Sequence, residues 1–149
     1  MKRFAFRLER VLKVRETVLS TRQVALAGAQ FRLGQEEETL AAVTGTLRRS
    51  ESQFRKAASG AAAPWRLALA SRYVRFLEFE EDKQQVEVEK ARDQVEICRQ
   101  RLIEARQETR ILEKLKDKRF GSYVSEVLKE DQSTLDEIGV TSYVTRGQV

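Results

Sequence analysis

Residues 8–54, LERVLKVRETVLSTRQVALAGAQFRLGQEEETLAAVTGTLRRSESQF, place a large apolar side chain at every seventh position. This row consists of Leu12, Leu19, Leu26, Leu33, Leu40, Leu47 and Phe54. A straight α-helix repeats every 3.6 residues, so a strict spacing of seven keeps one seam facing a partner only if two helices supercoil left-handedly. The stretch therefore predicts a coiled-coil helix over about residues 4–57.

The second row of this seam is mixed, because it reads Leu8, Arg15, Arg22, Ala29, Glu36, Val43 and Ser50. Long side chains such as Arg15 and Glu36 can lay their methylenes over the seam and keep their charges in water. Polar residues at seam positions also penalise wrong registers. Phe4 and Phe6 lie two residues apart and cannot both face the seam of a helix. One of them either closes this end of the pair or contributes to a contact.

A small-residue stretch, ASGAAAP at residues 58–64, ends this pattern. Gly60 is expected to take the left-handed conformation of a helix C-terminus, and Pro64 suits the first turn of a new helix. Helix, short loop and helix together predict an αα-hairpin. The seven-residue rhythm then resumes over about residues 65–138. Its two rows are Leu67, Val74, Glu81, Val88, Val95, Leu102, Thr109 and Ala70, Leu77, Gln84, Ala91, Cys98, Ala105, Leu112.

Folding the chain back about Gly60 brings apolar neighbourhoods of the two halves together. The sequence therefore predicts an all-α fold, an antiparallel two-helix coiled-coil hairpin within one chain, as a single domain over residues 1–149. Past about residue 118 the second helix has no partner, yet it carries apolar residues up to Ile138; such a stripe marks a partner site or a fold-back. Gly121 is a candidate bend, Gly139 is expected to end the helix, and residues 139–149 are expected to form a frayed tail.

Composition agrees with a few long helices, since 34% of the 149 residues are charged and there are only 7 Gly and 1 Pro. The net charge of +5 is interpreted as a property of the N-terminal end. There, Lys2, Arg3, Arg7, Arg10, Lys13, Arg15 and Arg22 face only Glu9 and Glu16. This end is either a solvated helix face or a docking end for an acidic protein surface. Nucleic acid is disfavoured, because no base-reading motif is present.

Neither a membrane span nor a signal peptide is expected, because the apolar runs are too short. Catalysis also finds little support. The chain has no histidine and no phosphate-binding loop, and its single cysteine, Cys98, occupies a seam row as a small hydrophobe. Consecutive carboxylates at residues 36–38 and 80–82 fan around a helix and cannot jointly hold a metal. A narrow helix pair also lacks the concave pocket of most active sites. We expect no enzyme activity, no cofactor and no metal.

A group of large apolar residues follows the predicted turn at Tyr73, Phe76, Leu77 and Phe79. They span too wide an arc for one seam. Either Trp65 and Phe54 recruit them to cap the tip of the hairpin, or part of the group is an exposed binding stripe.

The opening FAFRLERVLKVRE at residues 4–16 resembles the F-x-F-x-L-x-x-V-L-x-x-R-E opening of the flagellar export family FliJ, which has relatives in injectisome secretion. Further resembling residues are Val95, Arg99, Leu102, Glu113-Lys114-Leu115, Tyr123, Glu130, Gln132 and Leu135-Asp136-Glu137. The resemblance extends over about residues 4–138. It implies an antiparallel coiled coil similar to the γ stalk of rotary ATPases. Such a protein inserts the end with both termini into the hexameric flagellar export ATPase, meets the cytoplasmic part of the membrane export gate and handles export chaperones.

Carried onto this chain, the resemblance implies two contacts. The gate contact comprises Tyr73, Phe76, Leu77, Glu80 and Gln84; the ATPase contact comprises Phe4, Arg7, Arg10, Arg15, Leu115, Tyr123 and Leu135. The heptad pattern itself predicts the coiled-coil seam, which comprises Leu12, Leu19, Leu26, Leu33, Leu40, Leu47, Val88, Val95 and Leu102. The resemblance also implies a cytoplasmic protein that reaches the inner membrane only through partners, and the hairpin within one chain predicts a monomer. The alternatives are a generic coiled-coil tether or homodimer using the same leucine row, and a basic nucleic-acid-associated protein.

Overall fold

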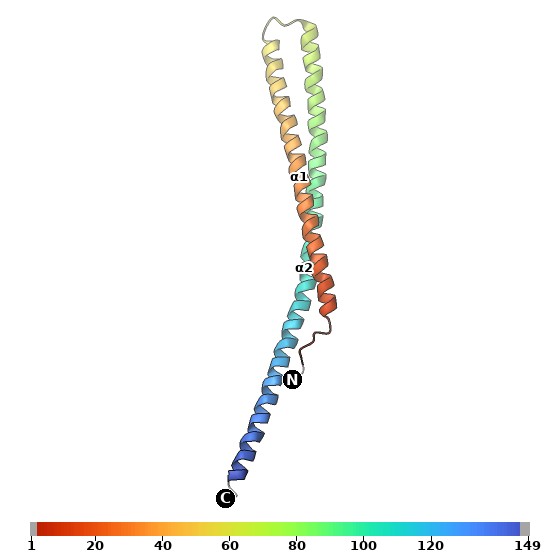
Figure 1. Ribbon diagram of the computed structural model, residues 1–149. Coiled ribbons are helices and arrows are strands. Elements are labelled where there is room, and N and C mark those ends of the chain that lie inside the picture. Colours follow the sequence, from red (N-terminus) through yellow and green to blue (C-terminus); the bar gives the residue numbers. More distant parts are fainter. Residues whose placement is uncertain (1–2, 147–149) are drawn as a thin grey trace. The chain divides into compact units, whose positions relative to one another are not determined.

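Two long helices make up the fold of the computed structural model, which describes the backbone of residues 3–146 and the side chains of residues 3–139. Helix α1 spans Glu9–Ala58 and helix α2 spans Pro64–Arg146 (Figure 1). No strand occurs within residues 3–146. The predicted all-α helical hairpin is confirmed.

The bounds of both helices differ from those expected. Residues 3–6 are not helical, and α1 begins only at Glu9, whose backbone N–H donates to the carbonyl of Phe6 at 3.0 Å. Helix α2 continues through Gly121 and Gly139 to Arg146, so the expected stop at Gly139 is wrong. A glycine inside a helix costs only about 1 kcal/mol relative to alanine, which the adjoining turns can offset. Most of the tail expected to fray is therefore helical, and residues 147–149 lie outside the described residues.

The turn at residues 59–63 is built differently from the expected glycine cap. No described glycine has a positive φ, so Gly60 does not use the left-handed conformation. Instead the Ser59 hydroxyl donates to the carbonyl of Lys56 at 3.0 Å, satisfying one of the free carbonyls at the end of α1. Pro64 is the first residue of α2, where its missing N–H costs no hydrogen bond.

The chain divides into two compact units, which we describe separately. The turn unit comprises residues 20–103, and the terminal unit comprises residues 1–19 with 104–149. The single domain expected from the sequence stays a prediction.

In the turn unit, residues 20–58 of α1 and 64–103 of α2 run antiparallel and side by side (Figure 1). The side chains that face the partner helix are those of the two heptad rows. Buried members are Leu47, Leu77, Val88 and Val95; half-buried members include Leu26, Leu33, Leu40 and Leu102. Burial of this one stripe provides the apolar driving force that holds the two helices together.

A polar layer interrupts the seam of the turn unit. The Thr44 hydroxyl donates to the Glu81 carboxylate at 2.6 Å, and the Gln84 amide donates to the Glu36 carbonyl at 3.2 Å and to its carboxylate. Among the described residues no buried side-chain nitrogen or oxygen lacks a partner. Since a shifted register would separate these pairs, the layer favours one alignment of the helices at a cost in apolar burial.

In the terminal unit, the start of α1 packs against α2 through a short apolar core with ion pairs at its edges. Phe6, Leu12, Ala105 and Thr109 are buried, whereas Leu19 is half-buried. The edge pairs join Arg15 to Glu108 at 2.6 Å and Glu9 to Lys116 at 2.9 Å. Because these ion pairs are partly exposed, they help to align the two helices but contribute little to the free energy of unfolding.

The seam can be tested with two valines of α2 that differ in burial. Val88 is 2% exposed and Val86 is 48% exposed. Val88→Ala removes buried methyl groups and should lower the free energy of unfolding by about 2 kcal/mol. Val86→Ala, the matched control, should change it by less than about 0.5 kcal/mol. Urea unfolding followed by circular dichroism measures both values, and equal effects would contradict the assigned seam.

Candidate functional site

Groups that could carry catalysis are sparse in the described part of the chain. Residues 3–139 contain no cluster of three side chains suited to hold a metal ion. Cys98 is a free, half-buried thiol on a seam row of α2.

Neither helix, over the residues that the structure describes, contains a segment long and apolar enough to cross a membrane.

A groove of about 430 Å³ lies between the helices of the turn unit, contrary to the expectation that a helix pair lacks a concave pocket. Small residues at facing positions open it, since they leave space that leucines fill elsewhere in the seam. Its lining includes Ala25, Gly28, Ala29, Ala91 and Cys98, with Arg32 and Glu36 among the polar residues. The remaining lining residues are Glu87, Lys90 and Gln94.

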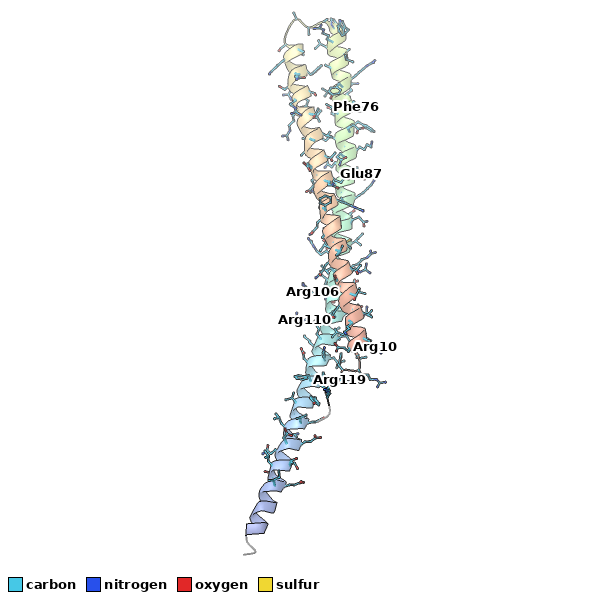
Figure 2. All side chains as sticks on the ribbon, viewed as in Figure 1. Arg10, Phe76, Glu87, Arg106, Arg110 and Arg119 are labelled. Carbon is cyan, nitrogen blue, oxygen red and sulfur yellow. The ribbon has the colours of Figure 1, made fainter. Side chains whose placement is uncertain are left out.

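The aromatic residues after the turn lie mostly on the surface. Tyr73, Phe76 and Phe79 are exposed, and Trp65 is 65% exposed, so Trp65 does not draw them into a cap over the turn. Figure 2 shows the Phe76 side chain on α2. Phe54 is half-buried, in a depression that it lines together with Tyr73. Of the two interpretations, the exposed stripe describes this group better.

The five residues expected at the export gate divide between surface and seam. Tyr73 and Phe76 are exposed, and Glu80 lies 3.8 Å from Lys83 at the edge of α2. Leu77, by contrast, is 7% exposed within the seam, and the Gln84 amide is bonded to Glu36 of α1. While the helices are paired, only Tyr73, Phe76 and Glu80 can present their side chains to a partner.

An aromatic cluster joins the N-terminal segment to α2 within the terminal unit. The Phe4 ring lies 5.2 Å from that of Phe120 and 5.6 Å from that of Tyr123, between centroids. Phe6 is buried as well. The restriction that residues two apart cannot share a side holds for helices only, and this segment is not helical. The chain's own N-terminal segment thus contacts the start of the expected overhang and covers it in part, since Phe120 is 51% exposed.

The other residues expected at the ATPase have different surroundings. Arg7 and Arg10 are exposed, whereas Arg15 is paired with Glu108. Leu115 is half-buried and Leu135 is exposed. Phe4 and Tyr123 contact each other, as described above, so they support the shape of this end as well as any contact.

The structure adds cations of α2 that a count along the chain did not single out. Arg106, Arg110 and Arg119 belong to the same unit as Arg10, and all four are exposed (Figure 2). Arg106 and Arg110 lie one helical turn apart on the segment that pairs with α1. This spacing is the sequence feature from which their shared position on one face of the helix could have been predicted.

Beyond residue 119 the sign of the charge reverses. Residues 120–139 hold one basic residue, Lys129, and five acidic ones: Glu126, Glu130, Asp131, Asp136 and Glu137. Exposed apolar residues such as Leu128 and Leu135 lie between them. The terminal unit thus combines a basic paired part with an acidic helix that bears exposed apolar side chains.

The family model described as flagellar FliJ protein matches residues 4–148 of the chain. A solved structure described as a YscO homolog, CT670 from Chlamydia trachomatis, is similar with a TM-score of 0.49 and 17% sequence identity. That match covers 98% of this chain and 99% of the other. The comparison with curated proteins found no match.

The aromatic cluster provides a test of the terminal unit. Phe4→Ala removes the ring that packs on Phe120 and Tyr123, which is worth roughly 1 kcal/mol beyond its buried area. We expect amide hydrogen exchange of α2 around residues 117–124 to become about tenfold faster. Phe31→Ala is the matched control, since Phe31 is 68% exposed in the other unit. Unchanged exchange in the Phe4 variant would contradict the cluster.

Proposed function

Because the chain belongs to the flagellar FliJ protein family, we propose that it is a non-enzymatic stalk and chaperone of the flagellar type III export apparatus. In this proposal it docks into the hexameric export ATPase and links that ATPase to the membrane export gate and to export chaperones. Family membership alone makes it a flagellar type III export protein; the finer role is the proposal. The observation that carries it is the family match over residues 4–148.

The terminal unit is the proposed ATPase side. Its exposed cations Arg7, Arg10, Arg106 and Arg110 can meet an acidic surface and speed the encounter with it. Leu135, which is exposed on the helix beyond this basic part, offers an apolar contact of the kind that contributes binding energy once buried.

The turn unit is the proposed gate side. Exposed aromatic side chains supply large contact areas at low entropic cost, and Tyr73 and Phe76 are both of this kind. Leu77 packs in the seam and thereby holds this part of α2 against α1. Glu80 lies one turn from Phe76 and adds a charge at the edge of the contact.

In this proposal the protein is a monomer and lies in the cytoplasm at the inner face of the inner membrane. The leucine row that a homodimer would use is turned toward α2 of the same chain, and Leu12 and Leu47 are buried there. A concentration-independent mass of 17.2 kDa in light scattering is the result consistent with this state.

The ATPase contact can be tested with the full chain and the export ATPase of the same organism. We expect the wild-type protein to bind this ATPase and to change its rate of ATP hydrolysis. Arg7→Glu/Arg10→Glu reverses two exposed charges and should weaken binding about tenfold or more, because like charges then face each other. Pull-down and a steady-state ATP hydrolysis assay measure the two effects.

Arg48→Glu/Arg49→Glu is the matched control for this experiment. It makes the same change of charge at adjoining exposed positions of the turn unit and should leave ATPase binding unchanged. The proposal fails if the wild-type chain neither binds nor alters turnover at micromolar concentration. Equal losses in both double variants would point to general charge attraction instead of a docking site.

A further inference from the structure

The end of the turn unit that carries the turn is strongly basic. Residues 45–77 contain a single acidic residue, Glu51, and seven basic ones: Arg48, Arg49, Arg55, Lys56, Arg66, Arg72 and Arg75. All seven are exposed, and Arg55, 3.4 Å from Glu51, is the one among them that forms an ion pair in the described structure. The interpretation that the positive charge belongs to the N-terminal end alone was therefore incomplete. The chain has a second basic region at the turn.

Helix α2 presents a second apolar stripe at this same end, on the side away from the seam. Trp65, Leu69, Phe76 and Phe79 are spaced by four, seven and three residues, which places them in one arc of the helix. All four are exposed, Trp65 by 65% and Leu69 by 63%. The seam residues, which alternate with them along the sequence, are instead buried or half-buried. We call these four residues the outer stripe.

Cationic side chains border the outer stripe as far as Phe76, whereas Phe79 lies between Glu78 and Glu80 in the sequence. Arg72 falls within its arc, Arg75 lies on one flank, and the Arg66 guanidinium lies 5.3 Å from the centre of the Trp65 ring. The turn next to it, residues 59–63, is Ser-Gly-Ala-Ala-Ala and adds no negative charge. The first four turns of α2 thus form an amphipathic segment whose outer side is both aromatic and basic.

We propose that the turn end of the protein binds directly to the surface of a lipid bilayer containing anionic headgroups. Headgroup phosphates would meet Lys56 and the arginines that form no ion pair in the described structure, and the outer stripe would enter the boundary between headgroups and acyl chains. Clusters of four to eight basic residues on an amphipathic helix are typical of binding to anionic lipids. Tryptophan suits this boundary, because its ring is apolar while its N–H remains able to hydrogen-bond.

Charge complementarity favours the bilayer over the other occupants. An apolar protein groove would cover the outer stripe but leave the cations without partners. A nucleic acid would neutralise the cations but leave Leu69 and the three alanines of the turn, residues 61–63, without apolar surroundings. An anionic bilayer satisfies both features at one site. This inference goes beyond the proposed stalk role, in which the chain reaches the membrane through partners only.

Trp65 makes the inference directly measurable, because it is the only tryptophan of the chain. The full chain is titrated with vesicles of phosphatidylglycerol and phosphatidylcholine, and separately with vesicles of phosphatidylcholine alone. With the anionic vesicles, tryptophan emission should shift to shorter wavelength as the indole leaves water. Neutral vesicles should give no shift, and about 0.5 M salt should reduce the response to anionic vesicles strongly, because it screens exposed charges.

Two double variants locate the contact. Arg48→Glu/Arg49→Glu should reduce partitioning into anionic vesicles about tenfold or more, since each basic residue near such a surface contributes to attraction. Arg7→Glu/Arg10→Glu, with the same change of charge in the terminal unit, should partition as the wild type does. Circular dichroism verifies that each variant is helical, and the wild-type comparison of the two vesicle types stands independently of the variants.

Several results would overturn the inference. These are an unchanged emission spectrum with anionic vesicles, an equal response to neutral vesicles, or equal losses in both double variants. A response to double-stranded DNA or polyglutamate that exceeds the response to anionic vesicles would also reject the bilayer, and would identify the basic region as a site for that soluble polymer. The residues of the basic region at the turn and of the outer stripe do not belong to the proposed ATPase contact, so the ATPase test and the vesicle test can fail separately. Phe76 is shared with the proposed gate contact, whereas Arg48 and Arg49 belong to neither contact.

Discussion

The pairing of two halves of one chain along a single apolar seam is the constraint on which the rest of the structure depends. A two-helix seam is narrow, and its most buried members, such as Val88 and Leu12, are few. Such a seam by itself would tolerate several alignments. The hydrogen bonds from Thr44 to Glu81 and from Gln84 to Glu36 act against this freedom, because they form in one register only.

A narrow seam also explains where function can reside. Each helix commits only one stripe to its partner, which leaves the opposite sides available. The outer stripe on α2 and the exposed arginines of the terminal unit occupy these free sides. Binding residues can therefore change without loss of the fold, provided the heptad rows keep their apolar character. Leu77 and Phe76 illustrate the division, since neighbours in sequence serve the seam and the surface respectively.

Much of this arrangement could be predicted from the sequence, because the heptad period reports directly on which residues face a partner helix. The seven-residue leucine row was enough to predict two paired helices, and the short stretch before Pro64 located the turn. The prediction is wrong where a helical rule does not apply. Phe4 and Phe6 precede α1, so the spacing of helical neighbours does not restrict them, and Gly139 does not end α2, because a long helix tolerates one glycine.

The basic region at the turn was missed for a different reason. Counting charges along fixed stretches of the chain divided the arginines near residue 48 from those near residue 72. The turn brings these arginines to one end of the turn unit, so their combined positive charge becomes clear only when both helices of the hairpin are considered together. The sequence shows an excess of aromatic residues after the turn. It does not show that Leu77 belongs to the seam and the outer stripe to the surface, because that depends on which side of α2 is buried.

Intramolecular pairing can be measured most directly with spin labels at two exposed positions that face each other across the seam. Glu37 and Arg92 form an ion pair at 2.9 Å in the turn unit, so labels at Glu37→Cys and Arg92→Cys, in a Cys98→Ala background, report on this pairing. The account predicts a separation of roughly 10–20 Å, set by the spacing of packed helices plus the label linkers, that persists after dilution with unlabelled protein. A separation of several tens of ångströms, or a short one that disappears on such dilution, would contradict it.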